Sequence, residues 1–141
     1  MVSQVTVFLE NKPGRLAKVC RELANSGINM HSLYLADTTD FGVVRLLCDT
    51  PNAAVDALKA AGWRASLTQV LGVRLADEAG SLAKLLEFLD EAGINVEYGY
   101  CISTEGNVAV DILKVSSESA EQKLESAGFT LAKPEEIYTC D

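Results

Sequence analysis

The sequence predicts an α+β fold in which one small domain occurs twice, each copy being a ferredoxin-like βαββαβ sandwich. The first observation is a repeated frame. Gly14 recurs as Gly80, the run Gly-Ile-Asn at 27–29 recurs at 93–95, and Gly62 recurs as Gly128, always 66 residues later (80 − 14 = 66). The second observation is that strand-like and helix-like apolar patterns follow one another in the same order in both copies. We expect domain 1 to span residues 1–69 and domain 2 to span residues 70–141.

The first copy shows these patterns clearly. Alternating apolar residues predict a strand at 4–10, which Pro13-Gly14 ends. A helix is expected from there to about Ser26, because its apolar residues recur at helical spacing. Strands are expected at 29–36 and 42–49, joined by a turn at 37–40. Thr50-Pro51 is a typical helix start, with a hydroxyl cap before a proline, and this helix should stop at Gly62. A fourth strand is expected at 63–69.

The second copy repeats this order without a linker. A strand is expected from 70, carrying Leu71, Val73 and Leu75, followed by a helix whose apolar stripe is Leu82, Leu85, Leu86 and Leu89. Strands at 95–103 and 108–115 should precede a helix capped by Ser116 or Ser117. A last strand is expected at 129–132, with a helical turn in the tail.

Both helices of each copy should lie on one face of an antiparallel sheet. The second strands are apolar and belong at sheet edges, where bare strands are unstable. Pairing residues 29–36 with 95–102 would place the two sandwiches side by side in one continuous antiparallel sheet. The third strand is apolar on both faces, so a second copy of the chain is expected to cover the face without helices, which predicts a homodimer.

Composition excludes several classes of function. The net charge is −8; residues 1–68 carry seven Lys/Arg against six Asp/Glu, and residues 69–141 carry five against fourteen. This acidity opposes nucleic-acid binding. No apolar run is long enough to cross a membrane, and the N-terminus does not resemble a secretory signal. Four dispersed cysteines and one histidine give no metal cluster, and no cofactor motif occurs. We expect a cytoplasmic protein with reduced thiols, which is not an enzyme.

The loop that begins each first helix is the candidate ligand site. A helix N-terminus presents unpaired N–H groups and a positive dipole end, which together attract a carboxylate. Asn11 or Asp77 could accept an α-ammonium group. If the edge strands pair antiparallel, Asn95 reaches the 11–16 loop and Asn29 reaches the 77–82 loop. A few charge-assisted hydrogen bonds, less the cost of association, suggest micromolar to millimolar affinity, about −8 to −4 kcal/mol.

A purely structural interpretation stays open on spacing alone. Gly14 and Gly80 could serve only a tight strand-to-helix turn, and Asn29 and Asn95 could serve only the helix exits. His31 lies two residues after Asn29 on the same strand face, so it either lines the second site or is solvated.

At these residues the chain resembles the ACT domain, a small-molecule-sensing module, twice over. The run from Leu9 to Leu16, followed by Gly27-Ile28-Asn29, is similar to the loop-and-helix signature of that family. The second copy departs from it at Asp77 and Ala79, where the family often has Asn and Pro. The resemblance covers nearly the whole chain and implies amino-acid binding between the two domains.

The candidate site residues form two groups. The first group is Asn11, Lys12, Pro13, Gly14, Arg15 and Leu16 with Asn95 and Val96. The second group is Asp77, Glu78, Ala79, Gly80, Ser81 and Leu82 with Asn29, Met30 and His31. Asp77 in place of Asn makes unequal affinities an expectation.

The sequence therefore predicts a non-catalytic regulatory module that binds a free amino acid as effector, with an enzyme of amino-acid metabolism as a possible partner. The alternative is a protein–protein adaptor, or a regulatory subunit without its own ligand, whose acidic second half docks an enzyme. A small enzyme would require a closed pocket with titratable groups, for which the sequence gives no motif.

Overall fold

The computed structural model describes residues 1–37, 41–103 and 106–141. The expected turn at 37–40 includes residues 38–40, which lie outside the described residues. The elements are β1 (Val2–Glu10), α1 (Arg15–Asn25), β2 (Met30–Asp37), β3 (Phe41–Cys48), α2 (Pro51–Ala60), β4 (Arg64–Ala76), α3 (Ser81–Glu91), β5 (Val96–Ser103), β6 (Val108–Val115), α4 (Ala120–Ser126), β7 (Thr130–Leu131) and a short 3-10 helix (Pro134–Glu136). The α+β class and the doubled βαββαβ order are confirmed.

The contacts divide the chain into two compact units whose ends are exchanged. The first unit consists of residues 3–68 and 134–141, and the second consists of residues 1–2 and 69–133. The domain boundary expected between residues 69 and 70 therefore falls inside β4.

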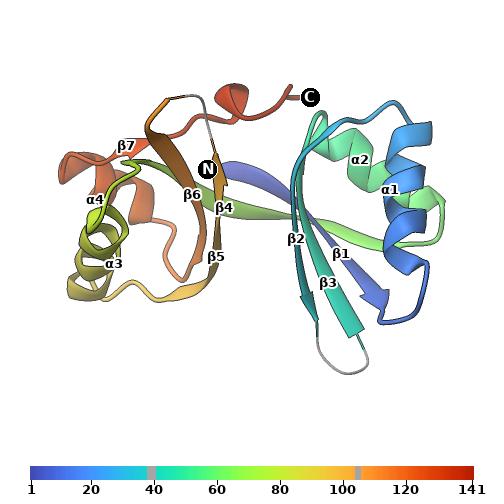
Figure 1. Ribbon diagram of the computed structural model, residues 1–141, viewed down its shortest axis with the longest axis horizontal. Coiled ribbons are helices and arrows are strands. Elements are labelled where there is room, and N and C mark those ends of the chain that lie inside the picture. Colours follow the sequence, from blue (N-terminus) through green and yellow to red (C-terminus); the bar gives the residue numbers. More distant parts are fainter. Residues whose placement is uncertain (38–40, 104–105) are drawn as a thin grey trace. The chain divides into compact units, whose positions relative to one another are not determined.

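The first unit has the strand order β2-β3-β1-β4, and α1 and α2 cover one face of this sheet (Figure 1). Alternate residues of neighbouring strands face the core in antiparallel pairs, such as the buried Val7 opposite the buried Val44. The core between sheet and helices is formed by Val5, Val7, Leu9, Val19, Leu23, Val44, Leu46, Leu58 and their neighbours. Full burial of each such aliphatic side chain contributes about 1.5–3 kcal/mol to the free energy of unfolding. The helical stripe expected from the sequence thus faces the sheet.

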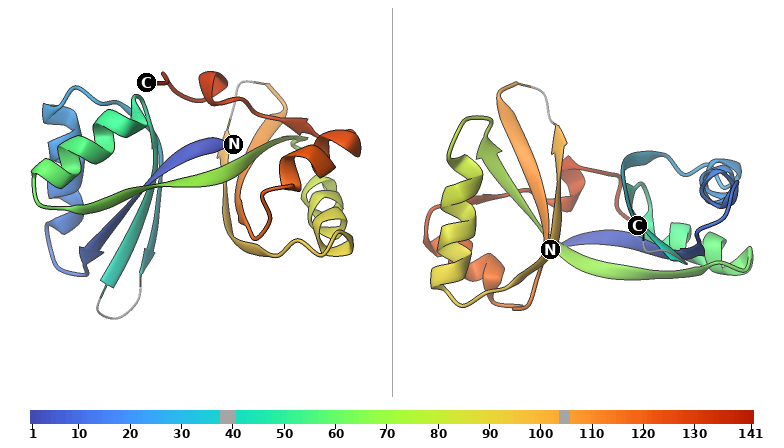
Figure 2. Two further views of the ribbon diagram at one scale, coloured as in Figure 1. Left: turned by 180° about the vertical axis from the view of Figure 1, so that it is seen from behind. Right: turned by 60° about the horizontal axis from the view of Figure 1, so that its bottom comes forward.

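The second unit repeats this layout with the order β5-β6-β4-β7, and α3 and α4 lie on one face of the sheet (Figure 2). Its core contains Leu71, Val73, Leu85, Leu89, Leu113 and Leu124. Gly72 suits a close approach: a Cβ there would lie 3.2 Å from the Cβ of Ala132 and 3.3 Å from Cγ2 of Val2, both closer than ordinary van der Waals contact. The first residues of the chain and the segment after β7 therefore pack on the same part of β4.

β4 is one strand of 13 residues, where the sequence predicted two strands at 63–69 and from 70. It contains no proline and no residue of positive φ, so the extended backbone continues from one repeat into the next. The strands of both repeats consequently belong to one antiparallel sheet that passes through β4. The last strand is shorter than the expected 129–132: Thr130 and Leu131 form the ladder with β4, and the N–H of Ala132 still donates to the carbonyl of Gly72 at 2.8 Å.

The expected pairing of residues 29–36 with 95–102 is not found within one chain. β2 pairs with β3, as in Leu33 opposite Leu46, and β5 pairs with β6, as in Tyr100 opposite Ile112. Among the described strand pairs, β2 and β5 are the outermost strands. The sheet is continuous between the two repeats through β4, and not through the pairing of β2 with β5 that the sequence analysis expected.

The start of α2 is capped differently from the expectation. Thr50 precedes the helix, but it adopts a left-handed conformation (φ 46°, ψ 62°) and its hydroxyl makes no cap bond. The Asp141 carboxylate accepts hydrogen bonds from the backbone N–H groups of Asn52 (3.1 Å) and Ala53 (2.8 Å). The N–H of Thr50 donates to the carbonyl of Thr139 at 2.7 Å. The tail of the chain therefore completes the first unit.

The cap of α4 is also displaced from its expected position. Ser119, rather than Ser116 or Ser117, is the residue before the helix, and no side chain caps it. The hydroxyl of Ser117 instead accepts a bond from the N–H of Ser119 at 3.3 Å and so orders the turn before the helix.

We predict that Asp141→Ala lowers the free energy of unfolding by about 1 kcal/mol, because the first N–H groups of α2 lose their cap. Glu135→Ala removes the same charge from the tail without touching the helix and is the control. Burial raises the pKa of Asp141, but the N–H bonds from Ala53 and Asn52 outweigh it and hold the pKa below its usual range. The stabilisation should therefore be present at neutral pH and disappear as pH falls through the lowered pKa. Urea unfolding at several pH values measures this; equal effects of the two variants would contradict it.

Candidate functional site

The two loops that begin α1 and α3 have the same backbone geometry. The N–H of Lys12 donates to the carbonyl of Glu10, and that of Glu78 to Ala76, both at 2.9 Å. The N–H of Arg15 and its counterpart in Ser81 each donate at 3.3 Å to the carbonyl three residues earlier. The sequence frame of 66 residues thus reproduces one local conformation twice.

Both helices start without a side-chain cap. Gly14 (φ 81°) and Gly80 (φ 94°) are the residues before the helices, and no side chain bonds to the N–H groups of either first turn. These values of φ are rarely accessible to residues with a Cβ, so the turn itself requires glycine. A Cβ at either position would meet nothing within 4 Å. The turn alone therefore explains why glycine stands at these two positions. The uncapped helix starts lie beside open space, where they can attract an anion.

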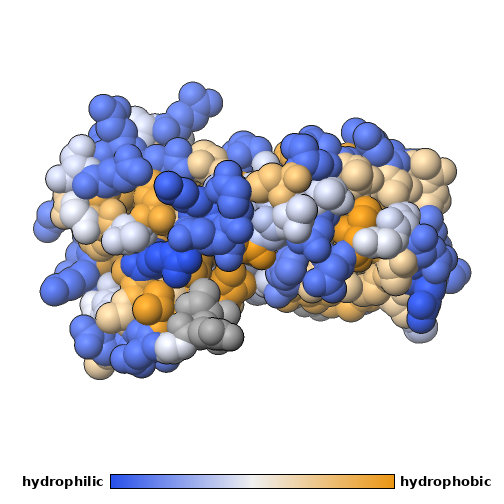
Figure 3. Space-filling view, turned by 90° about the horizontal axis from the view of Figure 1, so that it is seen from above, coloured by the Kyte–Doolittle hydropathy of each residue, from blue (hydrophilic) through white to orange (hydrophobic). Residues whose placement is uncertain are grey.

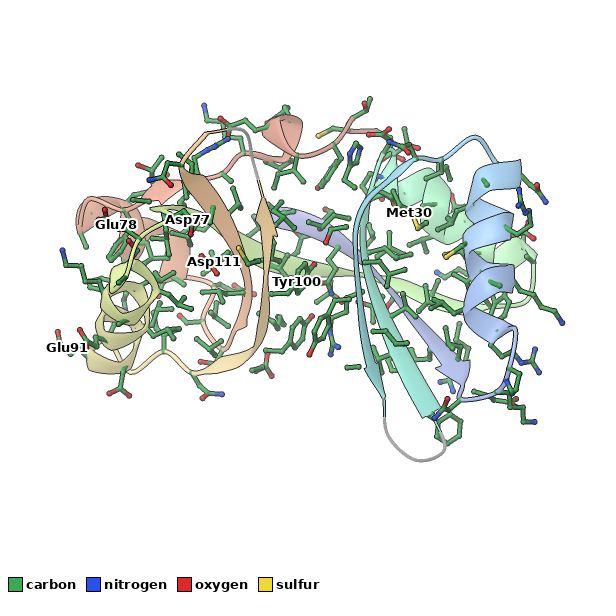
Figure 4. All side chains as sticks on the ribbon, viewed as in Figure 1. Met30, Asp77, Glu78, Glu91, Tyr100 and Asp111 are labelled. Atoms are coloured by element: carbon green, nitrogen blue, oxygen red, sulfur yellow. The ribbon has the colours of Figure 1, made fainter. Side chains whose placement is uncertain are left out.

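The two loops differ in charge. In the first, Lys12 Nζ lies 2.6 Å and Arg15 4.0 Å from the Glu10 carboxylate, and the Lys12 hydrogen bond with the charges of Lys12 and Arg15 lowers the pKa of Glu10. In the second, Figure 4 shows Asp77 and Glu78 at the start of α3. Neither acid makes an ion pair with another residue that the structure describes. The first loop therefore favours a carboxylate, and the second favours an ammonium group.

The asparagines lie at the other end of each unit from the loop of the same repeat. β1 and β2 are both antiparallel to β3, so they run parallel to each other; the loop follows the end of β1, and Asn29 precedes the start of β2. The carbonyl of Asn29 accepts the N–H of Asp49 at 3.0 Å. In the second unit the carbonyl of Asn95 accepts the N–H of Ser116 at 3.0 Å. A loop and its own asparagine thus cannot share a ligand, and the association of each loop with the asparagine of the other repeat stays a prediction.

Two of the predicted site residues line a surface hollow in the second unit. Asn95 and Val96 lie at the start of β5 and, with Leu86 and Asp90 of α3, border a cavity of about 440 Å³. In the first unit Met30 packs against the core instead (Figure 4). The two strand starts are therefore not equivalent in the space that they offer.

His31 belongs to a cluster that the sequence analysis missed. Its Nε2 lies 2.8 Å from Oδ1 of Asp49, and the same oxygen accepts the backbone N–H of Thr139 at 2.7 Å. The bond from Thr139, followed by that from His31, holds the pKa of Asp49 below its usual range. The histidine thus shares Asp49 with the tail of the chain. Thr139 of that tail lies more than 100 residues after His31, so no local pattern could indicate this arrangement.

Asp111 is the second residue that sequence reasoning missed. It lies on β6 between Val73 of β4 and Cys101 of β5, and its exposure is only 9%. At the equivalent position of the first repeat, opposite Val7, stands the fully buried Val44. Burial raises the pKa of the Asp111 carboxyl. The second repeat therefore holds an acidic group where the first holds a core aliphatic residue.

The described residues provide no other chemical centre. The four cysteines are free, and burial, with smaller effects of Asp49 and Asp141, raises the pKa of Cys48 to about 11. Within residues 1–37, 41–103 and 106–141 no group of three or more His, Cys, Asp or Glu is placed to hold a metal ion. None of the helices in these segments has the length and apolarity that a membrane span requires.

Comparison with known proteins places these observations in a family. The model of a family described as an ACT domain pair matches residues 1–126. The crystal structure of protein BT0572 from Bacteroides thetaiotaomicron is 33% identical, with a TM-score of 0.90 over 96% of this chain and 94% of that one. The regulatory subunit of aspartate kinase from Thermus thermophilus, in its ligand-free form, is 20% identical, with a TM-score of 0.63 over 88% of both chains. No curated protein matches the sequence.

We predict that Asp111→Val raises the free energy of unfolding at pH 7 by about 1–2 kcal/mol, because it replaces a buried carboxylate by the aliphatic side chain of the first repeat. A raised pKa means that the acid destabilises the fold increasingly as pH rises from its usual value, about 3.9, to the raised value. The gain should therefore be small in acid and complete at neutral pH. Urea unfolding of the variant, with Asp111→Asn as a shape-matched control, measures this. A destabilised Val variant would indicate that the carboxylate has a partner or a ligand.

Proposed function

Because the chain belongs to the ACT domain pair family, we propose that it is a regulatory module that binds a free amino acid. The observation that carries this proposal is the repeated uncapped helix start after Gly14 and Gly80. Each presents backbone N–H groups and a positive dipole end to open space, which suits the carboxylate of an amino acid. Hydrogen bonds to a charged ligand contribute about 1.5–3 kcal/mol each, and association costs at least several kcal/mol, so micromolar to millimolar affinity is expected.

The two loops should bind unequally. Lys12 and Arg15 add positive charge beside the first loop, and Asp77 and Glu78 add negative charge beside the second. A zwitterion placed with its carboxylate at the helix start is attracted by the former pair and repelled by the latter. We assign the tighter site to residues 11–16 and the weaker site to residues 77–82.

A dimer would bring each loop to an asparagine. β2 exposes Leu33 (41%) and Leu35 (43%) at the edge of the first unit's sheet. At the same positions of the repeat, β5 has Gly99 and Cys101, and α3 of this repeat exposes Leu82 and Leu86. Large side chains of one edge therefore match small ones of the other. The first repeat is nearly neutral in net charge, so it repels the acidic second repeat less than a second acidic repeat would.

We propose a homodimer in which β2 of one copy pairs antiparallel with β5 of the other. In this arrangement Asn95 of one copy reaches the 11–16 loop of its partner, and Asn29 reaches the 77–82 loop. Pairing also satisfies the backbone groups of both edge strands, which are unstable when bare.

The effector would act on an enzyme of amino-acid metabolism, and we assign no catalytic activity to the chain itself. The likeness to the regulatory subunit of aspartate kinase supports this choice of partner through its fold alone. Free thiols fit a reducing compartment, so we place the protein in the cytoplasm. The alternative function is an adaptor that docks such an enzyme through its acidic second repeat without a ligand of its own.

Titration calorimetry against each of the twenty amino acids tests the sensing proposal. One class of amino acid should bind, and Arg15→Gln should weaken the tighter site about threefold to tenfold, since it removes a charge near the carboxylate. Asp77→Asn should strengthen the weaker site by a similar factor. A ligand at 100 times its Kd should also add about 2.7 kcal/mol to the free energy of unfolding. Silence from all twenty amino acids would favour the adaptor.

Sedimentation velocity tests the dimer. The wild-type chain should sediment as a dimer, and Leu33→Lys with Leu35→Lys should shift it to a monomer, because a charge at an edge strand opposes pairing. Ala60→Lys with Ala61→Lys, at the exposed end of α2, adds the same charge elsewhere and should leave the dimer intact. A monomeric wild-type protein at about 0.1 mM, far above a micromolar Kd, would refute the proposed pairing.

A further inference from the structure

A groove in the first unit combines exposed aromatic side chains with arginines. It has a volume of about 670 Å³ and lies where β1 ends, β3 begins and the chain passes from α2 into β4. Phe8, Phe41 and Trp63 provide its apolar lining, with exposures of 49% for Phe8 and 59% for Phe41. Apolar residues reach the protein surface among polar ones in Figure 3, but large exposed aromatic rings grouped around one groove are the kind of patch that marks a binding site.

The charges at this groove are mostly positive, although the whole chain is acidic. Arg15 and Arg64 border it, and an adjoining hollow that shares Phe8, Trp63 and Arg64 adds Lys59. The single acid of the groove, Glu10, is paired with Lys12 at 2.6 Å. Arg64 makes no ion pair with the residues that the structure describes. A guanidinium group that is free to bind and lies beside apolar surface favours a carboxylate ligand, because it can donate two parallel hydrogen bonds.

Comparison of the two repeats shows that the fold does not require this set of side chains. At the equivalent positions the second repeat has Arg74 for Phe8, Val108 for Phe41, Phe129 for Trp63, Ser81 for Arg15 and Thr130 for Arg64. Only the aromatic residue before the fourth strand is kept, and Phe129 packs on Phe88 with ring centroids 5.4 Å apart. The same sheet end therefore forms without Phe8, Phe41, Arg15 and Arg64, so the fold alone does not explain their grouping in the first repeat.

We propose that this groove binds an organic carboxylate with a bulky apolar body, of the arylalkanoic-acid class. The aromatic side chains cover the apolar body, and Arg64 with Arg15 binds the carboxylate. The ligand needs no α-ammonium group and no backbone N–H of the loops. Arg15 borders both this groove and the 11–16 loop, but Arg64 lies outside the loop. The variant Arg64→Gln therefore separates this proposal from the amino-acid sensing proposed above, and either can fail without the other.

The chain carries its own probe for this site, since Trp63 is the only tryptophan. Titration with 3-phenylpropionate should change the tryptophan fluorescence with a Kd between about 10 µM and 1 mM. The neutral 3-phenylpropionamide should bind at least about tenfold more weakly, as should acetate, since each lacks one of the two recognised parts. Arg64→Gln should weaken binding about tenfold, whereas Arg21→Gln, an equal charge loss on the exposed side of α1, should not.

Phe8→Thr tests the apolar contact, and this variant should bind 3-phenylpropionate more weakly. Circular dichroism establishes that the variant is folded, and ligand-observed NMR gives a second measure of binding. The proposal is overturned if 3-phenylpropionate gives no response up to about 10 mM, a ΔG weaker than −3 kcal/mol. Equal binding of the acid and the amide, or equal Kd values for Arg64→Gln and Arg21→Gln, would also overturn it. The proposal is also overturned if a second copy of the chain occupies the groove. In that case the wild-type protein would not bind the acid, and it would form an oligomer that Phe8→Lys dissociates.

Discussion

The backbone hydrogen bonding of β4 is the constraint on which the fold depends. This strand of 13 residues closes the sheet of the first repeat with its beginning and opens the sheet of the second with its end. Buried N–H and C=O groups must be paired, so neither sheet is complete without its part of β4. A repeat of 66 residues is also near the lower size limit for a domain that folds alone. One uninterrupted strand therefore takes the place that a linker would have in a chain of independent domains.

Much of this fold was accessible from the sequence, because its patterns are local. The stripe Leu16, Val19 and Leu23 predicted a helix with one buried face, and the fixed offset from Gly14 to Gly80 predicted the duplication. What escaped prediction depends on residues distant in sequence. Asp141 caps a helix that begins 90 residues earlier, and Asp49 is shared between His31 and the tail. Thr50 has the sequence of a cap but cannot act as one in its left-handed conformation. The local propensity of a residue thus indicates which conformations it can adopt, and its tertiary contacts decide which of them it adopts.

The candidate site was predictable in part for the same reason. The glycines located the two helix starts correctly, since their positive φ follows from a turn that the sequence encodes. The turn conformation alone accounts for these glycines, because a Cβ at either position would meet nothing within 4 Å. Asp111 escaped a comparison of the repeats because the sequence offset of 66 residues matches it with Arg45, and only the strand pairing places it at the position of Val44. The groove around Trp63 has no linear motif, since its lining comes from three strand ends.

The exchanged ends of the chain have a consequence for how such a protein can evolve. Its first two residues belong to the second unit, where the N-terminal ammonium group pairs with Glu121, and its last eight belong to the first unit, where Tyr138 accepts the N–H of Ser3 at 2.8 Å. Each unit therefore contains a terminal segment that is contiguous in sequence with the other unit. Splitting the gene at the repeat boundary would deprive each product of a terminus that it borrows from the other, so selection can act on the halves only together. This frees the two loops to diverge in charge without either half having to persist alone.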